Sequence, residues 1–131
     1  MPRRMIATKK GTRTTMTNVS YESLVASWLL QDGWQVFTPL LDNGHSTDIL
    51  ISDGPHYYRI QVKTINAKDE ERYIQNRWKE NSIDVVIVFA RNSNWGYVVP
   101  AFKEQKRKLN FEGHHRFQNT KKEFLTAFHK V

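Results

Sequence analysis

The sequence predicts a small α/β protein in which helices flank one central mixed β-sheet. Apolar residues recur at helical spacing between Tyr21 and Leu29, which indicates an amphipathic helix. Several short runs rich in Val, Ile, Tyr and Trp follow, separated by the turn-forming residues Gly, Pro, Asn and Asp. A second apolar pattern of helical spacing closes the chain after Thr120. With 131 residues and no internal linker, the chain is expected to form one folded domain.

The first helix is expected to run from about Asn18 or Ser20 to Gln31, because both residues are favourable N-caps at the start of the apolar stripe. Residues 1–17 are rich in Thr, Lys and Arg and have no apolar period. They are therefore expected to form a basic flexible arm that precedes a single folded domain at residues 18–131.

Strand patterns occupy the middle of the chain. Gly33 is placed to end the helix, and residues 34–39 form a strand pattern that Pro39 closes. A turn is expected at Asp42-Asn43-Gly44. A β-hairpin is expected to follow at residues 48–64.

The C-terminal half alternates between polar and buried segments. Residues 65–82 are polar and predict mostly irregular chain. Residues 84–90 are rich in Val and Ile, which is typical of a central buried strand. Asn92-Ser93-Asn94 is expected to turn the chain into a further strand at residues 95–99. A capping-box pattern that begins at Thr120 predicts the last helix.

Three polar residues of the predicted hairpin are expected to share one face. If the chain turns about the Gly54–Pro55 bond, Asp48 lies directly across from Gln61. Side chains alternate along a strand, so Gln61 and Lys63 point to the same side and Val62 to the other. Because cross-strand partners share a face, the hairpin brings together a carboxylate, a carboxamide and an ammonium group.

These groups suit the binding of a hard divalent cation and a phosphate. Mg²⁺ prefers oxygen ligands, which the Asp48 carboxylate, the Gln61 amide and the Val62 backbone carbonyl would supply. Glu22, on the first helix, would add a second carboxylate. Lys63 would stabilise charge on a phosphate or position an attacking water. The set fits the hydrolysis of a phosphodiester, with Glu22, Asp48, Gln61 and Lys63 as candidate catalytic residues.

The same residues resemble the core of the PD-(D/E)xK nucleases. In that superfamily a helix glutamate precedes a β-hairpin that carries an aspartate and then an acid-x-lysine motif. Here Glu22, Asp48 and Gln61-Val62-Lys63 stand in those places and in that order. The matched elements cover residues 18–100, and the motif itself is short. The resemblance implies a restriction-endonuclease-like core.

Two positions depart from the usual motif. Thr47 stands where the motif has a proline directly before the aspartate. Gln61 stands where the motif has the acid two residues before the lysine, which removes one negative charge from the metal site. A Q-x-K form occurs in homing endonucleases associated with group I introns and in some free-standing phage relatives, which this chain resembles in size and element order. The resemblance implies an endonuclease that cleaves double-stranded DNA with Mg²⁺, or with Mn²⁺ as a substitute. Because two strands require two active sites, it also implies a homo-oligomer, a dimer or a tetramer.

Other interpretations of these residues stay open. The hairpin side chains could form a solvated face, and Glu22 could serve only as a partner of the helix dipole in the first turn. The same nuclease core also supports Holliday-junction resolvases. Gln61 could instead mark a DNA-binding module that has lost its catalytic activity.

The net charge of +7 is concentrated at the two ends of the chain. Residues 1–21 carry five basic and no acidic residues, and residues 102–131 carry eight basic and three acidic ones. This pattern suits a metal-binding centre flanked by phosphate-binding surfaces, with solvated lysines as the plain alternative. The candidate DNA contacts are Arg13, Tyr57, Arg59, Lys103, Lys106, Arg107, Lys108 and Arg116.

The composition excludes several classes of protein. No cysteine is present, which excludes disulfides, thiolate catalysis and Cys-based zinc sites. The longest apolar run, Val85 to Ala90, has the length of a strand and is too short to cross a membrane. The basic N-terminus lacks the apolar stretch of a signal peptide. A soluble cytoplasmic protein is therefore expected, in a bacterial or phage-infected cell and associated with its DNA if the family resemblance holds.

Overall fold

The computed structural model describes residues 1–41, 45–78 and 82–131, which contain two helices and eight strands. The helices are α1 (Lys10–Gln31) and α2 (Lys121–Phe128). The strands are β1 (Gln35–Phe37), β2 (Ile49–Ser52), β3 (Tyr57–Ile65), β4 (Tyr73–Gln75), β5 (Val85–Ala90), β6 (Trp95–Pro100), β7 (Lys106–Lys108) and β8 (His115–Gln118). The turn expected at residues 42–44 lies outside the described residues.

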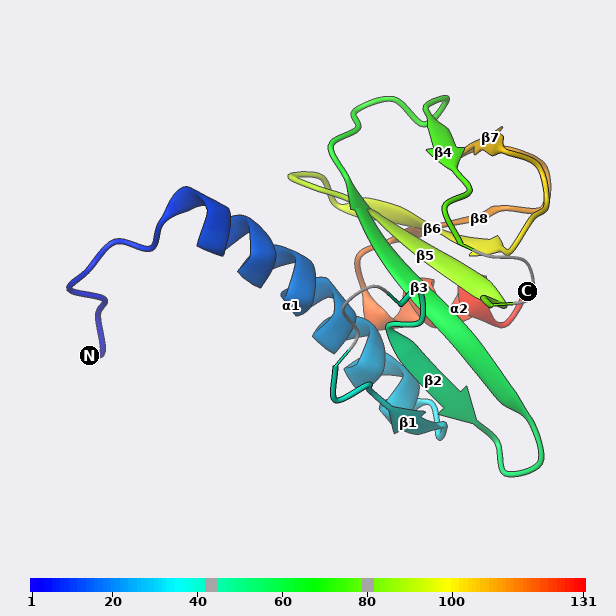
Figure 1. The fold of residues 1–131 in the computed structure, drawn as a ribbon, viewed down its shortest axis with the longest axis horizontal. Helices are drawn as coiled ribbons and strands as arrows, with labels where there is room; N and C mark the ends of the chain where they lie inside the picture. Colours follow the sequence, from blue (N-terminus) through cyan, green and yellow to red (C-terminus); the bar gives the residue numbers. More distant parts are fainter. Residues whose placement is uncertain (42–44, 79–81) are drawn as a thin grey trace.

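The main sheet is mixed, as the sequence predicts. Its described strands stand in the order β1-β2-β3-β5-β6-β8, and β3 pairs with β5 in parallel while the other neighbours are antiparallel. The segment between β3 and β5 leaves the sheet and contributes β4, which pairs with β7 in a separate two-stranded sheet (Figure 1). This excursion gives β5 the length of chain that a parallel crossover needs.

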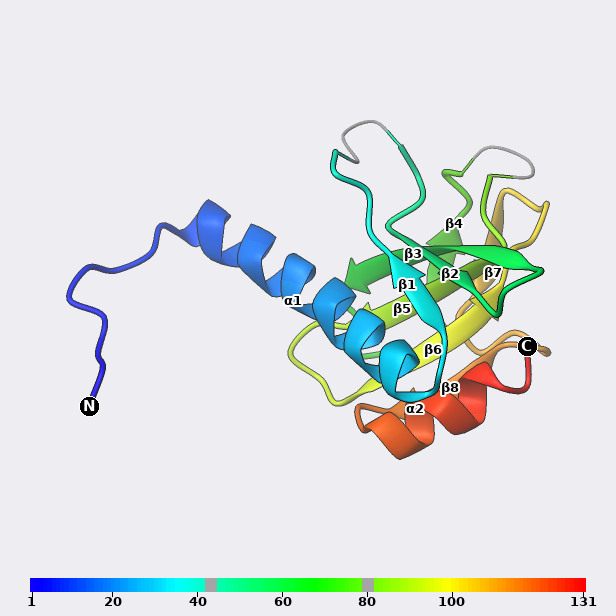
Figure 2. The same ribbon diagram turned by 90° about the horizontal axis from the view of Figure 1, so that it is seen from below.

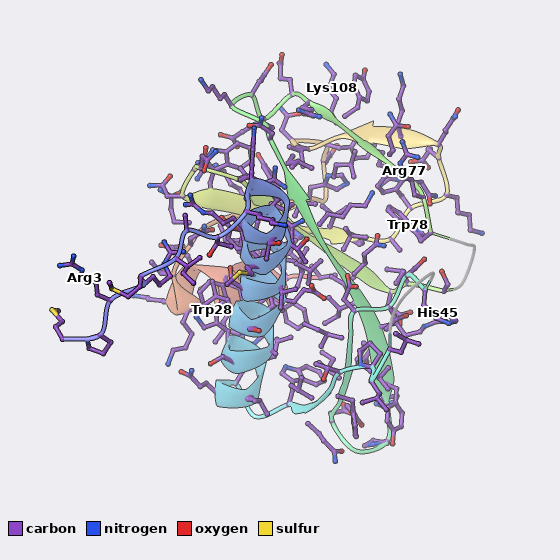
Figure 3. The ribbon with its side chains drawn as sticks, turned by 60° about the vertical axis from the view of Figure 1, so that its left-hand side comes forward. Arg3, Trp28, His45, Arg77, Trp78 and Lys108 are labelled. Carbon is purple, nitrogen blue, oxygen red and sulfur yellow. The ribbon has the colours of Figure 1, made fainter. Side chains whose placement is uncertain are left out.

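Two apolar clusters cover the two faces of the main sheet. On one face α1 and α2 pack against the sheet, with the Tyr21 ring stacked on Phe89 and Trp28 next to Phe124. On the other face, residues around β4 and β7 form the second cluster, which includes Trp78. Figure 2 shows the helices on one side of the sheet and the small β4–β7 sheet on the other, and Figure 3 shows Trp28 and Trp78 on opposite sides. Because both faces are covered, every residue of β5 is buried, as expected of the central strand.

The first helix begins earlier than the sequence pattern predicts. It starts at Lys10, so the expectation of a flexible arm at residues 1–17 is wrong for residues 10–17, while residues 1–9 lie outside any helix or strand. The early part of α1 projects beyond the sheet and is exposed, which explains why it has no apolar stripe (Figure 1). The packed half of α1, from Val25 to Leu29, supplies the helix nucleus. Extending the helix from this nucleus into the exposed residues requires no second nucleation.

Other local predictions are confirmed. Gly33 adopts a φ of 100° just after α1, and Asn92 adopts a φ of 64° in the turn before β6. The Thr120 hydroxyl caps α2 by accepting a hydrogen bond from the Glu123 N–H. The sequence analysis missed β4, β7 and β8, because two of them are three residues long and their exposed residues are mostly charged or polar. No helix among the described residues is long and apolar enough to cross a membrane.

Candidate active site

The hairpin of β2 and β3 has the register that its turn predicts. Gly54 adopts a φ of 114°, which is accessible to glycine, and the chain reverses at Gly54–Pro55. Ile49 pairs with Ile60, and the pairing continues regularly to the turn. Extending this register by one residue sets Asp48 opposite Gln61, as expected.

The ladder between β2 and β3 ends at Asp48. The Asp48 N–H donates to the Ile60 carbonyl at 2.9 Å, and the Asp48 Oδ2 accepts the Val62 N–H at 2.8 Å. Where β2 leaves β3, the Asp48 carboxylate therefore accepts the Val62 N–H in place of a backbone carbonyl of β2. In an extended strand the N–H and C=O of one residue point to the same edge, so the Val62 carbonyl is directed to this side as well. The end of the ladder thus gathers a carboxylate and a backbone carbonyl.

Glu22 and Asp48 line one hollow, as the sequence analysis expects of two cooperating carboxylates. The hollow has a volume of about 300 Å³ and lies between α1 and the segment after β1. Its lining residues are Val19, Glu22, Ser23, Ala26, Thr38, Pro39 and Asp48. Because α1 starts at Lys10, Glu22 is well past the first turn, where the helix dipole acts. The dipole interpretation of Glu22 therefore loses its basis.

Gln61 lies on the sheet face opposite α1. Its neighbours Ile60 and Val62 belong to the cluster under α1, so alternation directs Gln61 and Lys63 to the β4 side. The Gln61 Oε1 atom is buried and has no hydrogen-bond partner among the described residues. A buried amide oxygen without a partner is unfavourable by about 1–3 kcal/mol. A bound cation would supply the missing interaction.

The Lys63 ammonium is held against the small sheet. Its Nζ donates to the Gln75 carbonyl on β4 at 2.8 Å and lies 5.5 Å from the centroid of the Trp78 ring. Burial of the ammonium, and next the positive charge of Arg77, lower the pKa of Lys63 below its ordinary value. The hollow that contains Glu22 and Asp48 does not include Gln61 or Lys63 among its lining residues. Glu22 and Asp48 thus line the same hollow, and Asp48 accepts a hydrogen bond from Val62. Lys63 lies on the same face of β3 as Gln61 but does not line that hollow.

The donor atoms fit a hard divalent cation. All are oxygens, from two carboxylates, one amide and one backbone carbonyl, and Mg²⁺ prefers such ligands. Within the described parts of the chain, no three His, Cys, Asp or Glu side chains gather into a metal-binding group. Glu22 and Asp48 share one hollow, whereas the Gln61 Oε1 atom lies on the β4 side of the sheet, so a cation bound to all of them would have to lie at the edge where β2 leaves β3.

Several predicted DNA contacts lie near the β4 side of the sheet. Arg59 and Lys103 line a hollow of about 450 Å³ together with Trp78. The Arg59 backbone N–H and Nε both donate to the Asp84 Oδ2, at 2.7 and 3.5 Å. Tyr57 is 58% exposed, which leaves its ring accessible to a partner. Asp84 was not singled out from the sequence, because an acid before a buried strand gives no specific signal.

The basic run from Lys106 to Lys108 forms β7. Lys106 and Lys108 are exposed, whereas Arg107 is half-buried, lies 4.3 Å from the Phe111 ring centroid and pairs with Glu104. Arg116 on β8 donates to Glu70 at 2.8 Å. The two arginines thus make contacts within the protein, and the two lysines point outward.

Arg13 lies in a third place, on the projecting part of α1. It lines a hollow of about 490 Å³ with Lys10, Arg91 and several threonines. Arg91 donates to the Asn18 Oδ1 at 3.2 Å. Arg91 was not among the contacts predicted from the sequence, although it is a basic residue directly after a buried strand. This hollow is separate from the one that contains Asp48.

The arrangement of the sheet and helices can be compared with solved structures. A mixed six-stranded sheet, in the described residues, with flanking helices and a hairpin that opens at an aspartate has the restriction-endonuclease-like arrangement. Among solved structures, the chain is similar to the bacterial homing endonuclease I-Ssp6803I, with a TM-score of 0.52 and 22% sequence identity. The match covers 66% of this chain and 68% of that one. No family model and no curated protein matches the chain.

Proposed function

We propose that the protein is a Mg²⁺-dependent endonuclease that hydrolyses phosphodiester bonds in double-stranded DNA, of the site-specific homing type. The observation that carries the proposal is the end of the β2–β3 ladder, where Asp48 caps Val62 and the buried Gln61 Oε1 lacks a partner among the described residues. Its likeness in fold to I-Ssp6803I supports the same class of reaction.

Glu22, Asp48, Gln61 and the Val62 carbonyl would hold the cation. When bound, Mg²⁺ supplies positive charge to the phosphate oxygens and makes water a better nucleophile at neutral pH. Mn²⁺ prefers similar oxygen ligands and is expected to substitute. Glu22 and Asp48 contribute the negative charge of this donor set, and Gln61 contributes a neutral oxygen in place of a third acid.

Lys63 would stabilise the negative charge that develops on the phosphate. An ammonium group has three N–H donors, and one of them is bonded to the Gln75 carbonyl. This bond orients the Nζ and leaves two donors for a phosphate oxygen or the attacking water. Its lowered pKa also makes Lys63 more ready to give up a proton than an ordinary lysine.

DNA would be held by the basic ends of the chain. The excess of basic residues at both termini attracts a polyanion. Lys103, Lys106 and Lys108 lie on the β4–β7 side of the sheet, and Arg13 lies on the projecting part of α1. Because a duplex has two strands to cut, the active form is proposed to be a homodimer or homotetramer.

The test is a cleavage assay with the purified protein. Linear duplex from a mixed genomic source and a synthetic four-way junction are incubated with Mg²⁺, with Mn²⁺ or with EDTA. The proposal expects cuts at defined duplex positions with either metal and none with EDTA. Cleavage of the junction alone would replace the homing assignment with a resolvase. Binding without cleavage of any substrate would reassign the protein as an inactive DNA-binding module.

A further inference from the structure

The strands β4 and β7 form a two-stranded antiparallel sheet, here named the β4–β7 ribbon, which stands apart from the main sheet (Figure 1). Its inner face is anchored to the protein. Ile74 is 2% exposed and belongs to the second apolar cluster, and Arg107, its cross-strand partner, lies over the Phe102 and Phe111 rings. The contacts of Ile74 and Arg107 therefore hold the ribbon in place, and its position does not depend on its outer side chains.

The outer face of the ribbon is polar and carries no acid. Residues of a strand alternate between faces, and the exposed positions of both strands fall on the side away from Ile74. These outer residues are Tyr73, Gln75, Lys106 and Lys108. Lys106 lies 4.6 Å from the centroid of the Tyr73 ring, and Figure 3 shows Lys108 extending away from the body of the protein. Two ammonium groups and one carboxamide thus lie on the outer face of a ribbon whose inner face is packed against the protein.

This shape and chemistry match the DNA major groove. Paired strands lie about 4.8 Å apart, and the major groove, about 12 Å wide, admits a two-stranded ribbon. Lysine donates to the O6 and N7 acceptors of guanine, and glutamine pairs with the N6 and N7 of adenine. Phosphate attraction alone would not require a carboxamide opposite Lys106, because amides carry no charge.

The ribbon is also connected to the candidate active site. Gln75 turns its side chain to the outer face, while its backbone carbonyl accepts the hydrogen bond from Lys63. One residue therefore belongs to the outer face of the ribbon and touches the lysine proposed to act on the phosphate. Such a connection would fix the distance between the bases that are read and the bond that is cut.

We propose that the β4–β7 ribbon enters the DNA major groove and reads base edges through Gln75, Lys106 and Lys108. The inference rests on the proposed DNA substrate and goes beyond it, because it names the element that selects the sequence. A ribbon that only attracted phosphates would increase affinity for every sequence equally.

The experiment selects sequences from a pool of randomised duplexes in Ca²⁺, which permits binding measurements without Mg²⁺-dependent cleavage. The variants are Gln75→Ala and the double variant Lys106→Ala, Lys108→Ala. The control is the double variant Lys122→Ala, Lys130→Ala. Both lysines are exposed at the α2 end of the chain, and replacing them removes the same amount of charge. Circular dichroism and thermal unfolding check that each variant is folded.

The wild-type protein and the control are expected to select the same sequence. Gln75→Ala should lose its preference at one or two adjacent base pairs, by roughly 5- to 100-fold, with little change in affinity for unrelated DNA. The double lysine variant should relax selection at neighbouring positions. Unchanged selection by both ribbon variants would overturn the inference while leaving a DNA-binding protein.

Two further outcomes are decisive. If the double lysine variant weakens binding to all sequences equally and lowers the salt dependence by about two ions, the ribbon contacts phosphates only and the inference fails. If the wild-type protein binds no DNA, the proposed function fails and the inference fails with it.

Discussion

At the scale of single residues, Asp48 has two separable roles. Its Oδ2 accepts the Val62 N–H, which is a structural bond, and its charge would attract a cation. Asp48→Asn keeps an oxygen acceptor and removes only the charge, whereas Asp48→Ala removes both. We expect Asp48→Ala to lower the free energy of unfolding by about 1–3 kcal/mol, because the Val62 N–H loses its partner. Asp48→Asn should lower it by less, as measured by urea denaturation; equal losses would contradict the capping role.

The charge at position 61 is expected to affect metal binding, because the neutral Gln61 stands where the motif has an acid. Gln61→Glu places a carboxylate where the buried amide oxygen lacks a partner, so the affinity for Mn²⁺ is expected to rise by tenfold or more on the principle that ligand charge tunes affinity. Electron paramagnetic resonance of free Mn²⁺ measures the change. Gln105→Glu adds the same charge at an exposed position and serves as the control. An equal increase in both variants would show that Gln61 is not a ligand.

Lys63 provides a prediction about pKa. Burial first and Arg77 second hold the pKa of Lys63 below its ordinary value. Arg77→Ala removes the nearby positive charge, so the pKa of Lys63 should rise, while burial keeps it below that of a surface lysine. Nuclear magnetic resonance titration of the lysine side chains follows the shift, with Lys122→Ala as a control for loss of a distant charge. A pKa that falls or stays constant would be inconsistent with this environment.

At the scale of elements, the close contact of β6 with its neighbours depends on Gly96. A Cβ at this position would lie 2.4 Å from the Val88 carbonyl oxygen and 2.6 Å from the Phe117 ring. Gly96→Ala is therefore expected to lower the free energy of unfolding by about 1–3 kcal/mol. Gly11, on the exposed part of α1, has no heavy atom within 4 Å of such a Cβ.

Gly11→Ala is the matched control for this substitution. Alanine is a better helix former than glycine by about 1 kcal/mol, so this variant should unfold at the same or a slightly higher urea concentration. If Gly96→Ala unfolds like Gly11→Ala, the pairing of β5, β6 and β8 differs from the one described.

The elements that the sequence predicts are those with local causes. The register of β2 and β3 follows from the turn at Gly54, and α2 begins where the Thr120 hydroxyl can cap it. The exposed start of α1 extends from the packed half of the helix, and the strands β4 and β7 depend on pairing between segments distant in sequence, so no local pattern encodes these features. For the candidate site, the position of Asp48 at the end of the β2–β3 ladder could be derived from the hairpin register alone. The bond from Lys63 to a backbone carbonyl of β4 could not, because a carbonyl has no side-chain signal.

At the scale of the whole molecule, the two faces of the main sheet are covered by different elements, and each set of elements positions different residues of the candidate site. The helices cover one face and bring Glu22 to Asp48, and the segment around β4 covers the other and holds Lys63. The candidate site lies where β2 leaves β3, between these two layers (Figure 2). Two residues far apart in sequence, Glu22 and Asp48, thus line one hollow beside the end of the β2–β3 ladder.

The proposed hydrolysis of DNA at the candidate site is tested most directly by comparing three cleavage rates. The rate of duplex cleavage in Mg²⁺ is measured for the wild-type protein, for Asp48→Asn and for Asp53→Asn. Asp53 is a matched aspartate that accepts the His56 N–H in the hairpin turn, where asparagine can replace it. The account predicts that Asp48→Asn loses at least a hundredfold in rate while it stays folded, and that Asp53→Asn cleaves like the wild-type protein. Undiminished cleavage by Asp48→Asn would contradict it.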